Sequence, residues 1–109
     1  MRILSGIQPS GELHIGNYLG AIKNWVKLQG DQKNDCFFFI ADYHSITEDY
    51  NPKKKSKEIL DLAIDLLASG LNPKKSIIFQ QSQIPGHADL AWVFNALVKI
   101  SELERMTQF

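Results

Sequence analysis

Near the start of the sequence stands the stretch Ser5-Gly6-Ile7-Gln8-Pro9-Ser10-Gly11-Glu12-Leu13-His14-Ile15-Gly16-Asn17. An apolar run precedes it, small residues and a proline fill its middle, and a segment with helical spacing begins at its end. A strand that turns through small residues into a helix directs backbone N–H groups and the positive helix end toward one point. The stretch therefore predicts a phosphate-binding loop between a strand and a helix.

This loop differs from the two common nucleotide-binding motifs. The sequence contains neither Gly-x-Gly-x-x-Gly nor Gly-Lys-Ser/Thr, so it has no dinucleotide fingerprint and no Walker loop. On spacing alone, a simple connecting turn is an equal alternative.

Composition narrows the class of protein. The 109 residues have the length of one domain, and 44% of them are hydrophobic, enough for a core. Lys and Arg number 12, as do Asp and Glu, which argues against a dedicated nucleic-acid clamp. The single cysteine, Cys36, excludes an internal disulfide and is interpreted as a small apolar strand residue in a reducing compartment. With no signal-like or membrane-length apolar segment, we expect a cytoplasmic protein without membrane contact.

Strand-like and helix-like segments alternate along the chain. Short apolar runs predict strands, and apolar residues spaced three or four apart predict helices. The predicted order is a buried strand at 2–5, a helix at 14–29, a strand at 36–41 that is apolar on both faces, a helix at 51–70, a strand at 76–80 and a helix at 87–100. We therefore predict an α/β fold in the order β-α-β-α-β-α, the first half of a doubly wound, Rossmann-like parallel sheet.

Each predicted helix has an expected buried surface. The first is expected to bury one face, formed by Ile15, Leu19, Ile22 and Val26. The second is expected to begin at Asn51-Pro52, to end at Gly70, and to bury a stripe of six residues. These are Ile59, Leu60, Ala63, Ile64, Leu66 and Leu67. The third is apolar around almost its whole circumference, which predicts burial on several sides or an oligomer contact.

Polar clusters follow each of the predicted strands. They are Gln8-Pro9-Ser10, Asp42-Tyr43-His44 and Gln80-Gln81-Ser82-Gln83. Because the carboxyl ends of parallel strands share one edge of a sheet, we expect the three clusters to converge on a site. Asp42 is expected to cap the short turn after its own strand.

The opening stretch, extended to Ala21, closely resembles the start of bacterial-type tryptophanyl-tRNA synthetases, a family of class I aminoacyl-tRNA synthetases. His14 to Asn17 occupies the place of the class I His-Ile-Gly-His motif. Residues 40–47, 81–85 and 102–109 resemble later blocks of the family in the same order. Asn17 stands where a second His is usual, a departure that is common in the tryptophanyl branch and disfavours the tyrosyl relatives.

The resemblance implies a two-step ligation with ATP, L-tryptophan and tRNA(Trp). The tryptophan carboxylate attacks the α-phosphate of ATP to give tryptophanyl-adenylate and pyrophosphate, and the aminoacyl group then moves to the terminal ribose of the tRNA. Mg²⁺ is expected to arrive on the ATP phosphates, with no metal held by the protein. A homodimer is also implied. Catalysis of this kind depends mainly on positioning and charge stabilisation.

Residue roles follow from the same resemblance. Gln8, Pro9 and Ser10 are expected to line the ATP, and His14 and Asn17 to be the catalytic hydrogen-bond donors to its phosphates. Gly16 is expected to let the adenine and ribose lie against the helix start, where a Cβ would clash. For His14, the alternative is a surface histidine at a helix start.

Gly6, His44 and Gln108 are the expected tryptophan-binding residues. A buried imidazole that packs against the strand end is the alternative for His44. His87 is interpreted as a polar residue at a helix start.

Two further features have competing interpretations. The lysines at 53–57 are interpreted as a solvated helix face in preference to a tRNA contact, although cations in a first helical turn oppose the helix dipole. Trp92 and Phe94 fit either a subunit interface or core packing.

Several parts of the family are missing from the sequence. It contains no Lys-Met-Ser-Lys-Ser loop, and the acidic residue that reads the indole N–H and the anticodon-binding domain lie further along the family's chain. We therefore assign residues 1–109 to the N-terminal half of a class I synthetase catalytic domain and expect these residues alone to lack full activity. The alternatives are a truncated synthetase-like module that binds nucleotide or a protein partner without catalysis, and another adenylate-forming or nucleotidyl-transferring enzyme.

Overall fold

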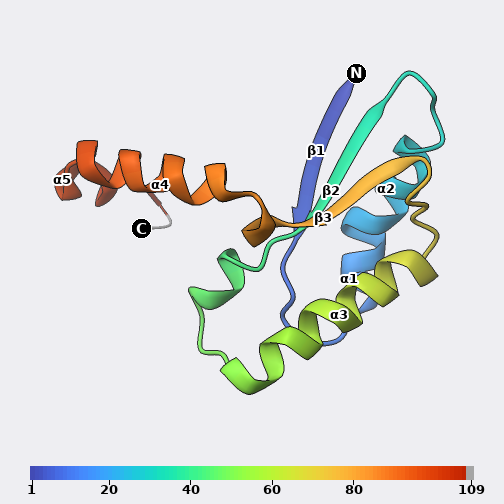
Figure 1. Ribbon diagram of the computed structural model, residues 1–109, viewed down its shortest axis with the longest axis horizontal. Helices are drawn as coiled ribbons and strands as arrows, with labels where there is room; N and C mark the ends of the chain where they lie inside the picture. The colour runs from blue at the N-terminus through green and yellow to red at the C-terminus, as the bar shows by residue number, and fades with distance from the viewer. Residues whose placement is uncertain (108–109) are drawn as a thin grey trace.

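A computed structural model describes residues 1–107. Figure 1 shows the strands and helices, in which strands alternate with helical segments along the chain. They are β1 (Arg2–Ile7), α1 (Ile15–Asn17), a π-helical turn (Tyr18–Ile22), α2 (Lys23–Leu28), β2 (Asp35–Ile40), a 3-10 turn (His44–Ile46), α3 (Pro52–Ala68), β3 (Ser76–Gln80), a second 3-10 turn (Gln81–Gln83), α4 (Pro85–Leu97) and α5 (Ile100–Leu103).

The three strands form one parallel sheet in the order β1-β2-β3. Ile7 of β1 pairs with Ile40 of β2, and Ile40 pairs with Gln80 of β3, so the three carboxyl ends lie at one edge. Helical segments connect the strands, as parallel pairing requires. The predicted α/β class and parallel sheet are confirmed.

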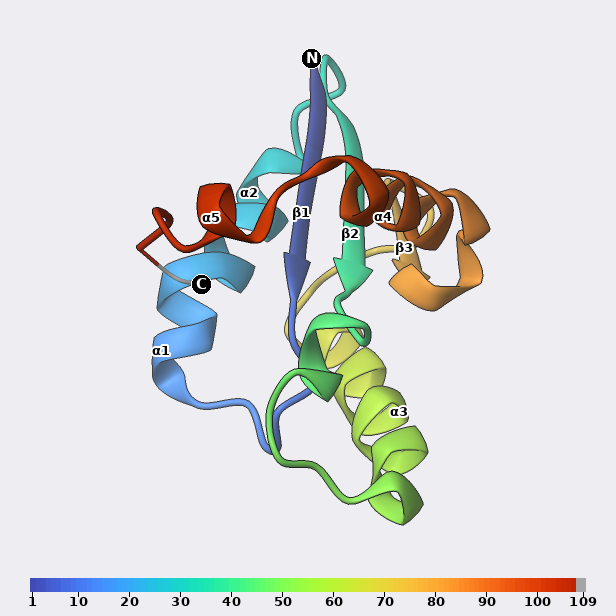
Figure 2. The same ribbon diagram turned by 90° about the vertical axis from the view of Figure 1, so that its left-hand side faces the viewer.

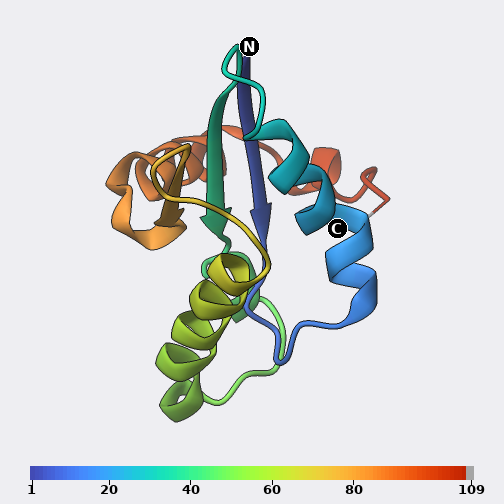
Figure 3. The ribbon, with the colours of Figure 1, turned by 90° about the vertical axis from the view of Figure 1, so that its right-hand side faces the viewer.

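The core lies between the sheet and two helices. Phe38 of the central strand is fully buried, and its ring stacks on Trp25 of α2 with centroids 4.7 Å apart. Leu62 and Leu66 of α3 complete this cluster with Ile22, Cys36, Ile40 and Leu71. Figure 3 shows α2 and α3 on this side of the sheet, whereas Figure 2 shows α4 and α5 on the other side.

The buried strand predicted at 2–5 is a half-exposed edge strand. β1 extends to Ile7, its side chains alternate between exposed and half-buried, and Leu4 keeps 63% of its surface exposed. Leu4 pairs with Phe37, and Phe37 with Ile77, along the face turned away from α2 and α3. Ile77 is also 55% exposed, because α4 does not cover this face.

The first predicted helix exists, but its buried face is wrong in part. Ile22 is fully buried, whereas Ile15 and Leu19 are 71% and 53% exposed. A π-helical turn from 18 to 22 breaks the 3.6-residue period on which the prediction depended. The larger number of residues per turn in this π-helical turn directs Trp25 into the core. The α1 segment extends beyond the carboxyl ends of the strands (Figure 3).

The ends of α3 are confirmed as predicted. Asn51 Oδ1 accepts a hydrogen bond of 2.9 Å from Lys53 N at the N-cap. At the other end Gly70 has a φ of 107°, and Leu71 N donates to Leu66 O at 3.2 Å. This left-handed cap needs glycine, because a Cβ disfavours positive φ.

The buried stripe of α3 differs from the predicted one. Leu62 and Leu66 are buried, and Ile59 and Ala63 flank them. Leu60, Ile64 and Leu67 are exposed by 60%, 54% and 47%. The stripe was misplaced because the helix has apolar residues on two sides and only one side meets the sheet.

Burial of the third helix is not observed. No residue of α4 is buried, and Trp92 and Leu97 are 76% and 71% exposed. Figure 1 shows the helix extending away from the sheet. Within residues 1–107, Trp92 and Phe94 are therefore not part of a core.

A buried amide joins α2 to the loop before β3. Gln29 is 8% exposed, and its Nε2 donates to Gly70 O at 2.8 Å. Its Oε1 accepts hydrogen bonds from Asn72 N at 2.9 Å and Ser76 Oγ at 3.2 Å. Gln29 thus fixes the α3–β3 connection through three polar groups.

Candidate active site

Two of the polar clusters predicted to converge are bonded to each other at the carboxyl edge of the sheet. Asp42 Oδ2 accepts from Gln80 Nε2 at 2.6 Å, and Asp42 Oδ1 accepts from Ser82 N at 3.0 Å. The first cluster makes its own link, from Gln8 Nε2 to Glu48 Oε2 at 3.3 Å.

The prediction that Asp42 caps the turn after its own strand is wrong. That turn is held by Ser45, whose Oγ donates to Asp42 O at 2.7 Å. The carboxylate crosses to the segment after β3 and is 8% exposed. Burial opposes its charge, but hydrogen bonds from Ser82 and Gln80 outweigh burial and hold the pKa of Asp42 below its usual value.

His14 caps the helix start that follows the loop. Its Nδ1 accepts from Gly16 N at 3.1 Å, and Asn17 Oδ1 accepts from His14 N at 3.1 Å. The two side chains form a reciprocal capping box. Because Nδ1 acts as an acceptor, the neutral imidazole carries its proton on Nε2. His14 is exposed, so its Nε2–H is available to a ligand, whereas Asn17 is half-buried.

Gly16 is needed by this cap. A Cβ on Gly16 would lie 2.9 Å from His14 Cε1 and 3.0 Å from His14 Nδ1. The imidazole would therefore have to leave its position over the first turn. The sequence predicted a clash with bound nucleotide at this glycine, and the structure adds a clash with His14 itself.

Gly6 has a comparable packing role. A Cβ on Gly6 would lie 2.5 Å from Phe39 Cζ, so the Phe39 ring occupies the space above the β1 backbone. This packing role is independent of the tryptophan-binding role predicted for Gly6, which concerns contact with a ligand.

The Gln8–Ser10 loop lines a cavity of about 250 Å³. Its lining includes Gln8 and Ser10 of the loop together with Tyr50, Lys55 and Glu58 from the start of α3 and the residue before its N-cap. Ser10 N donates to Gln8 O at 3.1 Å, so the loop turns tightly around Pro9. His14, Gly16 and Asn17 are brought together by the helix cap and are not among the lining residues of this cavity.

Two further residues were predicted to bind tryptophan, His44 and Gln108. His44 is exposed on the 3-10 turn after β2, so the alternative of a buried imidazole is wrong. Gln108 lies outside the described residues.

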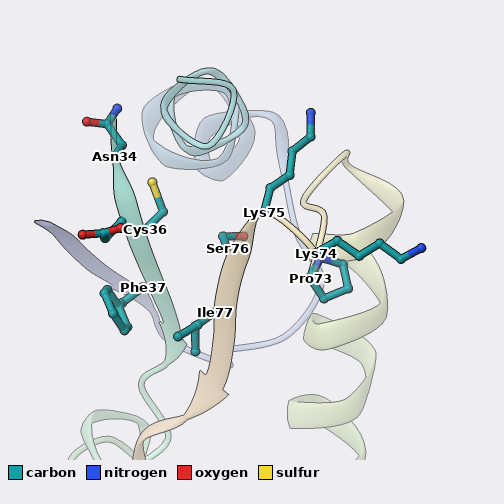
Figure 4. Close-up of a pocket in the computed structure, with 9 residues that line it drawn as sticks. Asn34, Cys36, Phe37, Pro73, Lys74, Lys75, Ser76 and Ile77 are labelled. Carbon is teal, nitrogen blue, oxygen red and sulfur yellow. The ribbon is translucent and has the colours of Figure 1, made fainter. Parts of the chain in front are cut away.

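Another cavity, of about 260 Å³, lies between the starts of β2 and β3 at the opposite edge of the sheet. Figure 4 shows Lys74 and Lys75 extending outward from the loop before β3. Cys36 lines this cavity and is 3% exposed. Burial raises the pKa of its thiol, with Asp35 adding to the effect, which suits a packing role for Cys36.

Residues 1–107 contain no group of three or more His, Cys, Asp or Glu side chains placed to hold a metal ion. Within the same residues, every helix is too short or too polar to cross a membrane.

Comparison with known proteins decides the family. Residues 1–109 match the family model described as "tRNA synthetases class I (W and Y)". The chain belongs to this family. The resemblance found in the opening stretch is therefore confirmed, and the match extends over all 109 residues of this synthetase chain.

Relatives of this synthetase chain are named as tryptophan–tRNA ligases. The protein from Rickettsia conorii is 50% identical over 107 residues, which is 98% of this chain and 32% of the relative. The one from Thermotoga maritima is 49% identical and covers 100% of this chain and 33% of the relative. The chain thus spans about a third of the length of the curated relatives that it matches.

Solved structures agree with the synthetase fold. Tryptophanyl-tRNA synthetase from Mycoplasma pneumoniae matches with a TM-score of 0.87 at 42% identity, over 99% of this chain and 32% of that one. The Campylobacter jejuni enzyme, complexed with ADP and tryptophan, matches with a TM-score of 0.85 at 41% identity. That match covers 96% of this chain and 32% of the other.

Sequence reasoning missed two residues that contact the Gln8–Ser10 loop of the candidate site. They are Glu48, which accepts from Gln8, and Lys55, whose Nζ donates to Pro9 O at 3.0 Å. Neither lies in a recognisable motif. The only sequence signal was the unfavourable placement of cations near Lys55 in a first helical turn.

Proposed function

We propose that the chain is the first part of the catalytic domain of a tryptophan–tRNA ligase. The observation that carries the proposal is the His14–Asn17 capping box, which follows the Gln8–Ser10 loop beyond the carboxyl end of β1. It occurs in a chain about 50% identical to tryptophan–tRNA ligases. The solved relative that was complexed with ADP and tryptophan supports the choice of ligands.

The proposed reaction is activation of L-tryptophan followed by transfer to tRNA(Trp). A tryptophan carboxylate oxygen bonds to the α-phosphorus of ATP as the bond to the bridging oxygen breaks, which gives tryptophanyl-adenylate and pyrophosphate. A terminal ribose hydroxyl of the tRNA then takes the acyl group and releases AMP. Mg²⁺ carried on the ATP phosphates offsets part of their charge.

The proposed roles of the site residues follow from their hydrogen-bonding capacity. His14 donates from Nε2–H and Asn17 from its neutral amide to phosphate oxygens. Gln8 and Ser10 line the ATP, whereas Pro9, expected from the sequence to line it, is buried between them and shapes the loop. Gly16 keeps the helix start open for both the imidazole and the nucleotide. Donors fixed before substrate binding stabilise developing charge most effectively.

Gly6, His44 and Gln108 are proposed to contact tryptophan. The exposure of His44 leaves its imidazole accessible to a ligand. Gly6 of β1 lies against the ring of Phe39, which belongs to the central strand β2. We further propose a cytoplasmic homodimer whose subunits meet at α4, since Trp92 is 76% exposed there.

The test is amino-acid-dependent ATP–pyrophosphate exchange by the full-length protein that contains this chain. Tryptophan is expected to support exchange, and tyrosine at the same concentration is expected to give only background. Preference for tyrosine would overturn the assigned specificity. Calorimetric binding of ATP and tryptophan without any exchange would instead identify a non-catalytic synthetase-like module.

A further inference from the structure

The lysine-rich first turn of α3 is not uniformly solvated, as the sequence had suggested. Lys53, Lys54 and Lys57 are exposed, but the side chain of Lys55 keeps only 14% of its surface exposed. A cation in the first turn of a helix is opposed by the helix dipole. Specific contacts of the ammonium therefore offset this cost, one with Glu58 of the same helix and two with groups outside it.

Three different groups hold the Lys55 ammonium. Its Nζ donates to Pro9 O at 3.0 Å, lies 2.7 Å from Glu58 Oε2 and sits 5.7 Å from the centroid of the Tyr50 ring. The carboxylate neutralises the charge, the ring covers it from another side, and the carbonyl receives a charge-assisted hydrogen bond. The ammonium is thus fixed in position and its charge is already paired.

The carbonyl that Lys55 holds belongs to the proposed ATP loop, 46 residues earlier in the chain. Pro9 lies between Gln8 and Ser10, and its side chain is almost fully buried. Lys55 projects from a helix that is anchored in the core by Leu66. The hydrogen bond therefore connects a rigid element to the middle of a short loop.

We propose that Lys55 is a positioning residue for ATP, acting through the Pro9 carbonyl to fix the Gln8–Ser10 loop. The proposal rests on the proposed function of that loop. Because Glu58 pairs with the ammonium, Lys55 acts by placing the loop and not by contributing charge to the phosphates. Holding donors in the binding geometry before ATP arrives lowers the cost of ordering them on binding.

The test compares Lys55→Met with Lys54→Met in the full-length protein that contains this chain. Methionine keeps an unbranched side chain and removes the donor, and Lys54 is an exposed lysine beside Lys55. In pyrophosphate exchange, Lys55→Met is expected to raise the KM for ATP about tenfold, which corresponds to about 1.4 kcal/mol. The KM for tryptophan is expected to stay within about twofold of the parent value in Lys55→Met. In Lys54→Met, the KM values for ATP and for tryptophan are both expected to stay within about twofold of the parent values.

A merely structural role would change the two KM values of Lys55→Met together. An equal rise in both, or an ATP KM less than about fivefold above that of Lys54→Met, would overturn the proposal. If Lys55→Met shows no cooperative thermal transition, Glu58→Gln replaces it, since it releases the ammonium from one partner. That variant is expected to raise only the ATP KM, by about threefold, and an unselective change would contradict the role of Lys55.

The parent protein separates the two proposals. A parent without tryptophan-dependent exchange overturns the proposed function and the role of Lys55 with it. An active parent in which the Lys55 and Glu58 variants show no selective effect on ATP overturns only the role of Lys55.

Discussion

Gln80 Nε2 donates a hydrogen bond of 2.6 Å to Asp42 Oδ2 and thereby joins the carboxyl ends of β2 and β3. The donor is the last residue of one strand, and the acceptor stands two residues beyond the other. A buried carboxylate, held by two donors from the neighbouring strand's end, thus organises the edge at which the candidate site lies.

Replacing Asp42 with Asn is expected to destabilise the protein by about 1.5 to 3 kcal/mol. The asparagine amide would turn an N–H group toward Gln80 Nε2 or Ser82 N, both of which are donors. Urea denaturation measures the loss. As control, Asp61→Asn removes an exposed pair with Lys57 and is expected to cost less than about 0.5 kcal/mol. Equal losses in the two variants would contradict the role given to Asp42.

The stability of the protein is expected to depend on pH through Asp42. Its folded-state pKa is lowered, so its contribution is present above the unfolded value of about 3.9 and is lost as pH falls through the folded pKa. The stability difference between parent and Asp42→Asn should therefore shrink as pH is lowered below about 4. Urea titrations at several pH values measure it, and a difference that stays constant would rule out this linkage.

Gly16→Ala is expected to slow pyrophosphate exchange between about tenfold and a hundredfold, because the new Cβ displaces the His14 imidazole from its cap. Gly20→Ala is the control, since its Cβ would meet nothing within 4 Å. A double-mutant cycle with His14→Ala tests the cause. If Gly16 acts through His14, the Gly16→Ala effect largely disappears in the His14→Ala background. Fully additive effects would show that the glycine serves the nucleotide alone.

Gly6→Ala is expected to lower the free energy of unfolding by about 1 to 3 kcal/mol. Its Cβ would lie 2.5 Å from the Phe39 ring, which must shift or tilt to make room. Phe39→Leu, which removes the ring, should reduce the cost of Gly6→Ala when the two are combined. Urea denaturation of the single and double variants measures this, and an undiminished loss in the double variant would disprove the steric explanation.

Leu62→Ala and Leu60→Ala are a matched pair on α3. Leu62 is 2% exposed, so its truncation is expected to cost about 2 to 5 kcal/mol, whereas Leu60 is 60% exposed and should cost less than about 1 kcal/mol. Urea denaturation of the 109-residue chain measures both. A larger loss of stability in Leu60→Ala than in Leu62→Ala would instead support the buried stripe expected from the sequence.

The elements of the fold were predictable because their signals are local. Asn51-Pro52 and Gly70 mark the two ends of α3 through cap geometry that involves only neighbouring residues. The apolar run in β2 indicated a central strand, and the structure places it between the other two. The opening stretch likewise identified the family, which the family model confirmed over the whole chain.

The burial of side chains was less predictable, because periodicity gives the spacing of a face and not its direction. On α3, two apolar stripes had the same period, and only contact with the sheet selects Leu62 over Leu60. In the first helix, a π-helical turn changed the spacing itself and moved Trp25 into the core. The proposed ligand contacts of His14, Asn17 and His44 remain predictions.

The sequence by itself determined the order of strands and helices, the caps of α3, and the loop from Gln8 to Ser10 with the His14–Asn17 motif after it. Only the tertiary structure decided which partners meet across the chain, such as Asp42 with Gln80 and Pro9 with Lys55, which are 38 and 46 residues apart. The physical reason is that caps and turns are satisfied by groups within a few residues. A buried carboxylate or ammonium takes whichever partner the packing of distant elements brings within about 3 Å.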